Sequence, residues 1–165
     1  MTAATATATP SPTTAAAVVD EFLRLIMRPD PVAARRYTAP GLRIRFTGGR
    51  AMADPTECTA FNAGRYNWVK KRIERTETVG AILVHNSPAS AQAGAAGVAA
   101  ALAADPQETV VYSLGTLYGE WPDGTPFEGN RYVDRYVVRA GLITEMEVWN
   151  DSAEWMMVRA GLARL

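Results

Sequence analysis

The sequence predicts an α+β protein in which N-terminal helices pack on one face of a curved antiparallel sheet. Helical periodicity and capping signals concentrate in residues 13–71, whereas long alternating strands separated by turn residues fill residues 108–150. A chain of 165 residues with 48% hydrophobic content is long enough to bury one core. We therefore expect one domain rather than several.

Residues 1–14 are rich in Thr, Ala and Pro, so we expect a disordered tail followed by a single domain over residues 15–165. This opening segment lacks the basic start and the strong apolar stretch of a signal peptide. No run in the chain is apolar and long enough to cross a bilayer. We therefore expect a cytoplasmic protein that makes no membrane contact.

The first helix is expected to begin at Thr13 or Thr14, whose hydroxyl can cap its N-terminus, and to stop at Pro29. A short second helical piece follows at residues 31–37. The apolar side chains that share one face of the first helix are Val18, Phe22, Leu25 and Ile26.

A third helix is predicted for residues 54–71, DPTECTAFNAGRYNWVKK. Asp54 lies at the N-cap position, Pro55 at the first helical position and Glu57 three residues after the cap, which is a capping-box arrangement. The side chains expected on its buried side are Phe61, Gly64, Arg65 and Trp68.

Strands are predicted for residues 41–49, where apolar and polar side chains alternate, and for residues 72–79. Residues 80–107 are rich in Ala and Gly and form an insertion between two strands, either a flexible loop or a weak helix, to which no chemistry is assigned. A long strand at residues 108–121, a turn at 122–124 and two further strands close the chain.

The last two strands allow two registers. A two-residue turn at Ala140 and Gly141 requires a positive φ at Ala140 and sets Asp134 opposite Glu147, like charge against like charge. A three-residue loop needs a left-handed conformation only at Gly141 and pairs Arg135 with Glu145. We therefore predict the three-residue loop.

This register separates the side chains of the hairpin onto two faces. The charged face contains Arg131, Arg135, Glu145, Glu147 and Trp149. The other face contains Tyr132, Asp134, Tyr136, Met146, Val148 and Asn150. The second face is apolar with a few polar groups, as small-molecule pockets are.

The preceding long strand also has two kinds of side. Its bulky side contains Tyr112, Leu114, Thr116 and Tyr118, and its small side contains Ser113, Gly115, Leu117 and Gly119. We expect the bulky side to face the helices. The small side would then face outward and let a second copy approach, so a homodimer through the sheet is expected.

Charge and composition exclude several classes of partner. Seventeen basic residues balance seventeen acidic ones, so no net field attracts nucleic acid or an anionic membrane. Cys58 is the only cysteine and His85 the only histidine, which excludes an intrachain disulfide and a Cys/His zinc cluster. We expect neither a metal site nor a cofactor.

The order of elements, ending in NRYVDRYVVRAGLITEMEVWND, resembles the nuclear transport factor 2-like superfamily and in particular its SnoaL-like branch, over most of residues 15 to 160. The resemblance implies a cone in which the curved sheet wraps around the N-terminal helices and encloses a cavity. Relatives include ketosteroid isomerase, polyketide cyclases, epoxide hydrolases and many members without catalysis. Fold alone therefore does not give function.

By this resemblance, Asp134 occupies the position of the protonated oxyanion-hole aspartate of ketosteroid isomerase. The position of that enzyme's general base is Phe46 here, and its first-helix tyrosine falls near Phe22. The positions that match the Arg/Asp/Asp set of the epoxide hydrolases are Leu114, Thr116 and Val148. Neither chemistry transfers intact.

Asp134 is the candidate catalytic acid or base, with Tyr118 and Tyr132 as catalytic partners. Burial would favour its neutral, hydrogen-bond-donating form, because Arg135 and Arg45 both fall on outward parity and supply no cation. The residues predicted to bind the ligand are Phe22, Phe46, Trp68, Tyr112, Leu114, Thr116, Tyr136, Met146, Val148 and Asn150.

Two functions are consistent with these residues. The first is a cofactor-independent isomerase, cyclase or hydratase that binds a small hydrophobic carbonyl or polyketide-like compound. The second is a non-catalytic ligand-binding or dimerisation module of the same fold. The polar groups on the inward face favour the first function, and the lack of a second carboxylate favours the second.

Overall fold

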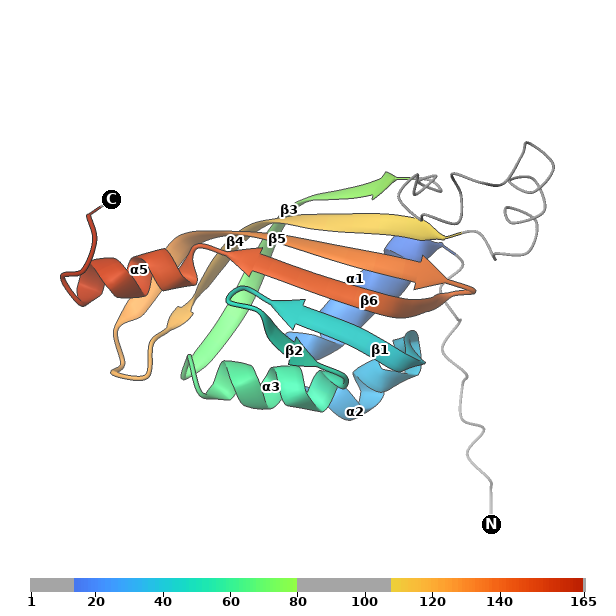
Figure 1. Ribbon diagram of the computed structural model, residues 1–165, viewed down its shortest axis with the longest axis horizontal. Helices are drawn as coiled ribbons and strands as arrows, with labels where there is room; N and C mark the ends of the chain where they lie inside the picture. Colours follow the sequence, from blue (N-terminus) through green and yellow to red (C-terminus); the bar gives the residue numbers. More distant parts are fainter. Residues whose placement is uncertain (1–13, 80–107, 165) are drawn as a thin grey trace, which may run out of the picture.

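The computed structural model describes residues 14–79 and 108–164 (Figure 1). His85, the predicted insertion at 80–107 and all but the last residue of the predicted tail lie outside this part of the chain. The helices are α1 (Ala15–Ile26), α2 (Pro31–Ala34), a 3-10 turn η1 (Arg35–Tyr37), α3 (Pro55–Ala63) and α5 (Ser152–Arg159). The strands are β1 (Thr38–Phe46), β2 (Arg50–Met52), β3 (Trp68–Val79), β4 (Thr109–Glu120), β5 (Pro126–Arg139) and β6 (Leu142–Asn150).

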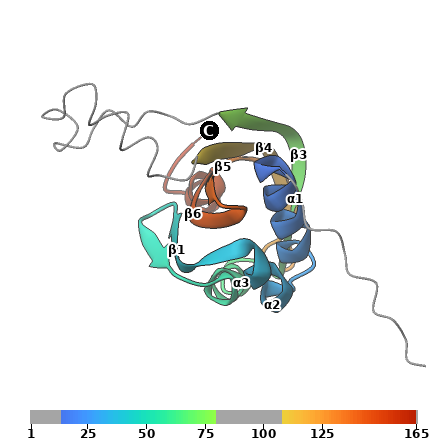
Figure 2. The same ribbon diagram turned by 90° about the vertical axis from the view of Figure 1, so that its right-hand side faces the viewer.

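The six strands form one sheet in the order β2-β1-β6-β5-β4-β3, which confirms the predicted α+β class. Every neighbouring pair is antiparallel except β1 and β6, which run parallel and bring Ile44 beside Met146. Viewed end-on in Figure 2, the curved sheet and helices α1, α2 and α3 close a ring. The inner face of the sheet therefore faces the helices.

Two capping interactions fix the helices as their sequences predict. The Ala17 amide donates to the Thr14 hydroxyl at 3.1 Å, and the Thr56 amide donates to the Asp54 carboxylate at 2.7 Å. The Arg35 guanidinium also donates to both oxygens of Asp54, at 2.8 and 3.0 Å. This hydrogen-bonded cation holds the pKa of the Asp54 carboxyl at about 2 and ties η1 to the start of α3.

The third helix is shorter than predicted. It ends at Ala63, and Gly64 forms its C-cap. Strand β3 begins at Trp68, opposite Glu120 of β4. Pairing with β4 along its whole length gives this segment a strand conformation, so sheet formation overrides the local helical signal. As a result Lys71, which the sequence assigned to a helix, lies on a strand.

The orientation of β4 is opposite to the prediction. Leu117 lies opposite Lys71 on the inner face, and Ser113 lies opposite the inward-facing Asp134. The residues that point to the outer face are Tyr112, Leu114, Thr116 and Tyr118. The prediction that they face the helices was wrong.

Close approach of β3 explains this orientation. A Cβ atom at Gly115 would lie 2.1 Å from the Arg72 carbonyl oxygen, and one at Gly119 would lie 2.2 Å from that of Trp68. Small residues are needed on the concave side of β4, where the β3 backbone occupies this space. The outer face consequently lacks the small surface on which the predicted dimer was based, and dimerisation through the sheet stays a prediction.

The turn of the last hairpin has two residues, Ala140 and Gly141, with φ values of 48° and 77°. Arg139 lies opposite Leu142, as this turn requires. The prediction of a three-residue loop was therefore wrong. The structure accepts the positive φ of a non-glycine residue here, and both central residues have the geometry of a tight hairpin turn.

A register shift beyond the turn removes the repulsion between Asp134 and Glu147 that had argued against a two-residue turn. The shift lies between Val137 and Val138, and it sets Asp134 opposite Val148 and Arg135 opposite Glu147. The predicted register, with Arg135 opposite Glu145, was wrong by two positions, although the Arg135 guanidinium contacts both carboxylates, that of Glu145 at 3.4 Å and that of Glu147 at 3.1 Å. A shift of two positions keeps every side chain on the same face of the sheet. The predicted division of this hairpin into a buried face and a charged face is therefore correct.

The C-terminal helix α5 was not predicted. Its first residue, Ser152, is fully buried, and its side chains Trp155 and Met156 pack against a cluster that includes Trp121 and Tyr132. Packing on this cluster stabilises a helix too short to be stable alone. Within residues 14–79 and 108–164, no helix has both the length and the apolarity that a membrane span requires.

We expect Gly115→Ala to destabilise the protein by at least about 2 kcal/mol, because the new methyl group meets a backbone carbonyl that cannot rotate away. Gly64→Ala is the matched control, since a Cβ there lies 3.6 Å from its nearest neighbour. Urea denaturation of both variants measures the difference. Equal midpoints would show that β3 can move away from β4 at little cost.

Candidate functional site

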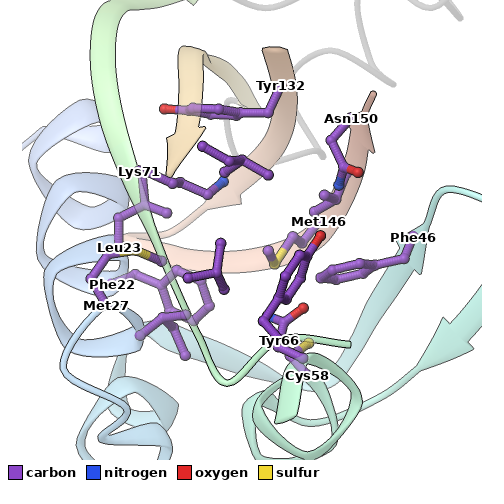
Figure 3. A pocket seen from close by; sticks show the side chains of 15 residues that line it. Phe22, Leu23, Met27, Phe46, Cys58, Tyr66, Lys71, Tyr132, Met146 and Asn150 are labelled. Atoms are coloured by element: carbon purple, nitrogen blue, oxygen red, sulfur yellow. The ribbon is translucent and has the colours of Figure 1, made fainter. Parts of the chain in front are cut away.

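A cavity of about 40 Å³ lies between α1, α3 and the inner face of the sheet (Figure 3). The residues that line it are Phe22, Leu23, Ile26, Met27, Phe46, Cys58, Asn62, Tyr66, Val69, Lys71, Leu117, Tyr132, Met146, Val148 and Asn150. Most of these side chains are apolar. Among the lining residues, Met27, Asn62 and Val69, which lie at the end of α1, on α3 and at the start of β3, are partly exposed, which indicates an opening on this side.

The size of the cavity limits its ligand. A water molecule needs roughly 10–15 Å³ of such space, so about 40 Å³ accommodates only a few water molecules. A compound of a few heavy atoms fits without rearrangement. A larger compound requires the side chains at the opening, such as Met27, to move.

An ion pair is buried beside this cavity. The Lys71 ammonium contacts Oδ2 of Asp134, and these side chains are 9% and 0% exposed. The Tyr136 hydroxyl donates to the same Oδ2 at 2.8 Å. In Figure 3 the Tyr132 ring lies over Lys71, with Nζ 4.0 Å from the ring centroid. The cation therefore touches a carboxylate and an aromatic face.

Burial shifts the acid–base properties of this group. Desolvation lowers the pKa of the Lys71 ammonium, and the charge of Asp134 opposes this only in part. Desolvation also raises the pKa of Tyr136 well above its ordinary value and that of Tyr132 to about 12. Both tyrosines are therefore neutral hydrogen-bond donors near neutral pH.

This environment changes the role of Asp134. From the sequence we predicted no cation near it and a neutral carboxyl that donates to a ligand. Instead Lys71 and Tyr136 both donate to its Oδ2, so Asp134 acts as an acceptor. Its Oδ1 has no hydrogen-bond partner among the described residues. The charged donor on the cavity wall is Lys71, and Asp134 lies behind it.

A second polar group lies near α5. The Tyr66 hydroxyl donates to Oγ of Ser152 at 2.7 Å, and the Ser152 amide donates to Oδ1 of Asn150 at 3.1 Å. Tyr66 and Asn150 both line the cavity. The cavity thus has an ionic group on the β3 side and neutral hydrogen-bonding groups near the C-terminal helix.

The structure brings only some of the predicted site residues together. Phe22, Phe46, Tyr132, Met146, Val148 and Asn150 line the cavity. Asp134 and Tyr136 are buried on the same inner face, next to Lys71. Trp68, Tyr112, Leu114, Thr116 and Tyr118 point away from it. Trp68 is 46% exposed and packs edge-on against Tyr118 outside the sheet, so neither contacts the cavity.

Sequence reasoning missed Lys71 because its segment was assigned to a helix. One signal could have found it. Gly64 interrupts the helical pattern, and Val69 and Lys71 then alternate with Lys70 as in a strand. Cys58 also lines the cavity, although the sequence did not predict it to bind a ligand. Burial raises the pKa of its thiol to about 12, so Cys58 contributes packing rather than a thiolate.

Solved structures with the same fold share little sequence with this chain. A nuclear transport factor 2-like protein from Burkholderia thailandensis is 15% identical, with a TM-score of 0.59 and coverage of 90% of this chain and 97% of that one. A candidate SnoaL-like polyketide cyclase from Jannaschia is 18% identical, with a TM-score of 0.55 and coverage of 90% and 93%.

A third match is a protein of ketosteroid isomerase-like fold from Catenulispora acidiphila in complex with trimethylamine. It is 14% identical, with a TM-score of 0.52 and coverage of 80% of this chain and 83% of that one. No protein-family model and no curated protein matches the chain. The three solved structures show that the chain has the nuclear transport factor 2-like fold. At this level of identity the likeness defines the fold alone.

We expect Lys71→Met to destabilise the protein by roughly 3 kcal/mol, because it leaves the buried Asp134 carboxylate without its cation. Adding Asp134→Leu should recover part of this loss. Arg43→Met, which removes a surface pair with Glu145, is the matched control and should change stability little. Thermal and urea denaturation measure all three. A Lys71→Met effect no larger than the control would contradict a structural role for the pair.

Proposed function

We propose that the cavity binds a small, mostly apolar molecule that carries a carbonyl oxygen, with the Lys71 ammonium donating a hydrogen bond to that oxygen. The observation that carries this proposal is a single cationic donor, Lys71, on an otherwise largely apolar wall. One ammonium proton is directed to Asp134, and a lysine has three. A hydrogen bond from a charged donor in a desolvated site is strong and selects for an oxygen acceptor.

The apolar walls support the same class of ligand. Phe22 and Leu23 of α1 face Phe46 and Met146 across the cavity in Figure 3. These side chains offer dispersion contacts but no hydrogen bonds to a ligand. A ligand with many polar groups would lose its hydration there without gaining hydrogen bonds, and would bind weakly. The trimethylamine complex of the Catenulispora protein supports ligand binding in this fold, although the compound is of another class.

A second candidate function is cofactor-independent acid–base catalysis, as in an isomerase, cyclase or hydratase acting on the same carbonyl compound. The observation that favours it is the contact between Lys71 and Asp134. Because Lys71 has a lowered pKa, its ammonium is a stronger acid than an ordinary one. Its proton can pass to the carbonyl oxygen while Asp134, whose Oδ1 has no partner among the described residues, accepts the proton removed from the α-carbon; the product is the enol. The non-catalytic alternative keeps the binding step without this proton transfer.

The test of binding uses a ketone and a hydrocarbon of the same shape. We expect 2-butanone to bind at least about tenfold more tightly than 2-methyl-1-butene, because only the ketone accepts a hydrogen bond from Lys71. NMR chemical-shift titration of the full chain measures both affinities. Equal affinities would remove the role of Lys71 as donor. Deuterium incorporation next to the carbonyl in D₂O, above the uncatalysed rate, would distinguish the enzyme from the binding module.

A matched pair of variants locates the binding site. Val69→Phe fills the cavity at its opening and should weaken 2-butanone binding by about tenfold or more, since one ring occupies the space of the ligand. Val133→Phe makes the same change on the outer face, where Val133 lies opposite Leu114, and should leave binding unchanged. Loss of binding in both variants, or in neither, would place the ligand elsewhere.

A further inference from the structure

Lysine is scarce in this chain. Of its seventeen basic residues only Lys70 and Lys71 are lysines, and the others are arginines. The two lysines are adjacent on β3 and point to opposite faces of the sheet. Lys70 lies opposite Tyr118 on the outer face and is exposed, whereas Lys71 lies opposite Leu117 and reaches the cavity.

The identity of this buried cation has a chemical consequence. An arginine guanidinium forms a better bidentate pair with a carboxylate, but it keeps its proton at every physiological pH. A lysine amine can lose its proton, and then its nitrogen is a nucleophile. A lysine desolvated in an apolar pocket is one arrangement by which proteins activate this nucleophile. Lys71 has both features, a 9% exposed side chain and apolar neighbours.

We propose that Lys71 forms a Schiff base with a small aldehyde or ketone bound in the cavity, an inference that rests on the proposed carbonyl ligand. Three contacts of the described residues support it. Asp134 touches Nζ and is placed to accept its proton. Tyr136 donates to the same carboxylate oxygen and stabilises it. The Tyr132 ring holds Nζ at the cavity wall.

The reaction begins with proton transfer from the Lys71 ammonium to the Asp134 carboxylate. The nitrogen lone pair attacks the carbonyl carbon, an N–C bond forms, and the C=O π electrons move to the oxygen, which takes the proton from Asp134. A proton then passes from nitrogen to Asp134 and leaves with the hydroxyl group as water. The products are a protonated imine, one water molecule and the Asp134 carboxylate, and no other reactant is consumed.

The apolar cavity favours the imine over its hydrolysis. Few water molecules fit beside a bound ligand in about 40 Å³. Desolvation lowers the pKa of Lys71, so a larger fraction of its amine is neutral than in an ordinary lysine. The protonated imine keeps a positive charge next to Asp134, so the buried carboxylate remains paired after the reaction.

Reductive trapping tests this reaction on the full chain. The protein is incubated with propanal and sodium cyanoborohydride, which converts an imine to a stable propylamine, and the modified residue is located by peptide mass spectrometry. We expect at least about tenfold more adduct at Lys71 than at Lys70, because the cavity concentrates the aldehyde beside Lys71 and burial lowers the pKa of its amine. This comparison within one molecule requires no variant.

Two variants serve as controls. Lys71→Arg keeps a cation beside Asp134 and should abolish the cavity adduct, while Lys70→Arg should leave labelling of Lys71 unchanged. Equal labelling of the two lysines, or labelling of Lys70 alone, would overturn the Schiff base. If 2-butanone still binds in that case, the proposed carbonyl-binding function stands without the covalent step. If 2-butanone does not bind either, both proposals fail.

Discussion

The buried charge of Asp134 is the constraint on which the rest of this structure depends. Its side chain has no exposed surface, and an ionised carboxyl in such a place needs a cation and hydrogen-bond donors. Lys71 supplies the cation from β3, whose backbone packs so closely on β4 that side chains at Gly115 and Gly119 would clash with its carbonyl oxygens. The curvature of the sheet, the position of the cavity and the burial of one lysine are therefore consequences of the same packing.

The same pair connects stability with chemistry. Removing water from Lys71 and Asp134 costs free energy, and their attraction offsets that cost only when both are present. This desolvation lowers the pKa of Lys71. An amine with a lowered pKa can act as a hydrogen-bond donor, an acid or a nucleophile. A protein that needed only a stable core would be served at least as well by two apolar side chains here. This is why the proposed function rests on the Lys71–Asp134 pair.

Similarity of fold alone does not establish a role for the Lys71–Asp134 pair. The solved structures described above are at most 18% identical to this chain. Their fold can be assigned to it, but their chemistry cannot. The resemblance to ketosteroid isomerase directs attention to Asp134, which the structure places on the inner face of the sheet. Its carboxylate contacts Lys71, a residue on a different strand that the resemblance did not point to. Function in this fold depends on such neighbours.

The sequence alone determined what depends on neighbouring residues. Thr14 and Asp54 cap their helices because a cap is local, and alternation placed Tyr132, Asp134 and Met146 on one face because side chains of a strand alternate. Only the tertiary structure decided which face of β4 is concave, where the bulge resets the last hairpin, and that Lys71 meets Asp134. The first and the last of these outcomes depend on contacts between residues far apart in the chain, and alternation distinguishes two faces without saying which one is inside.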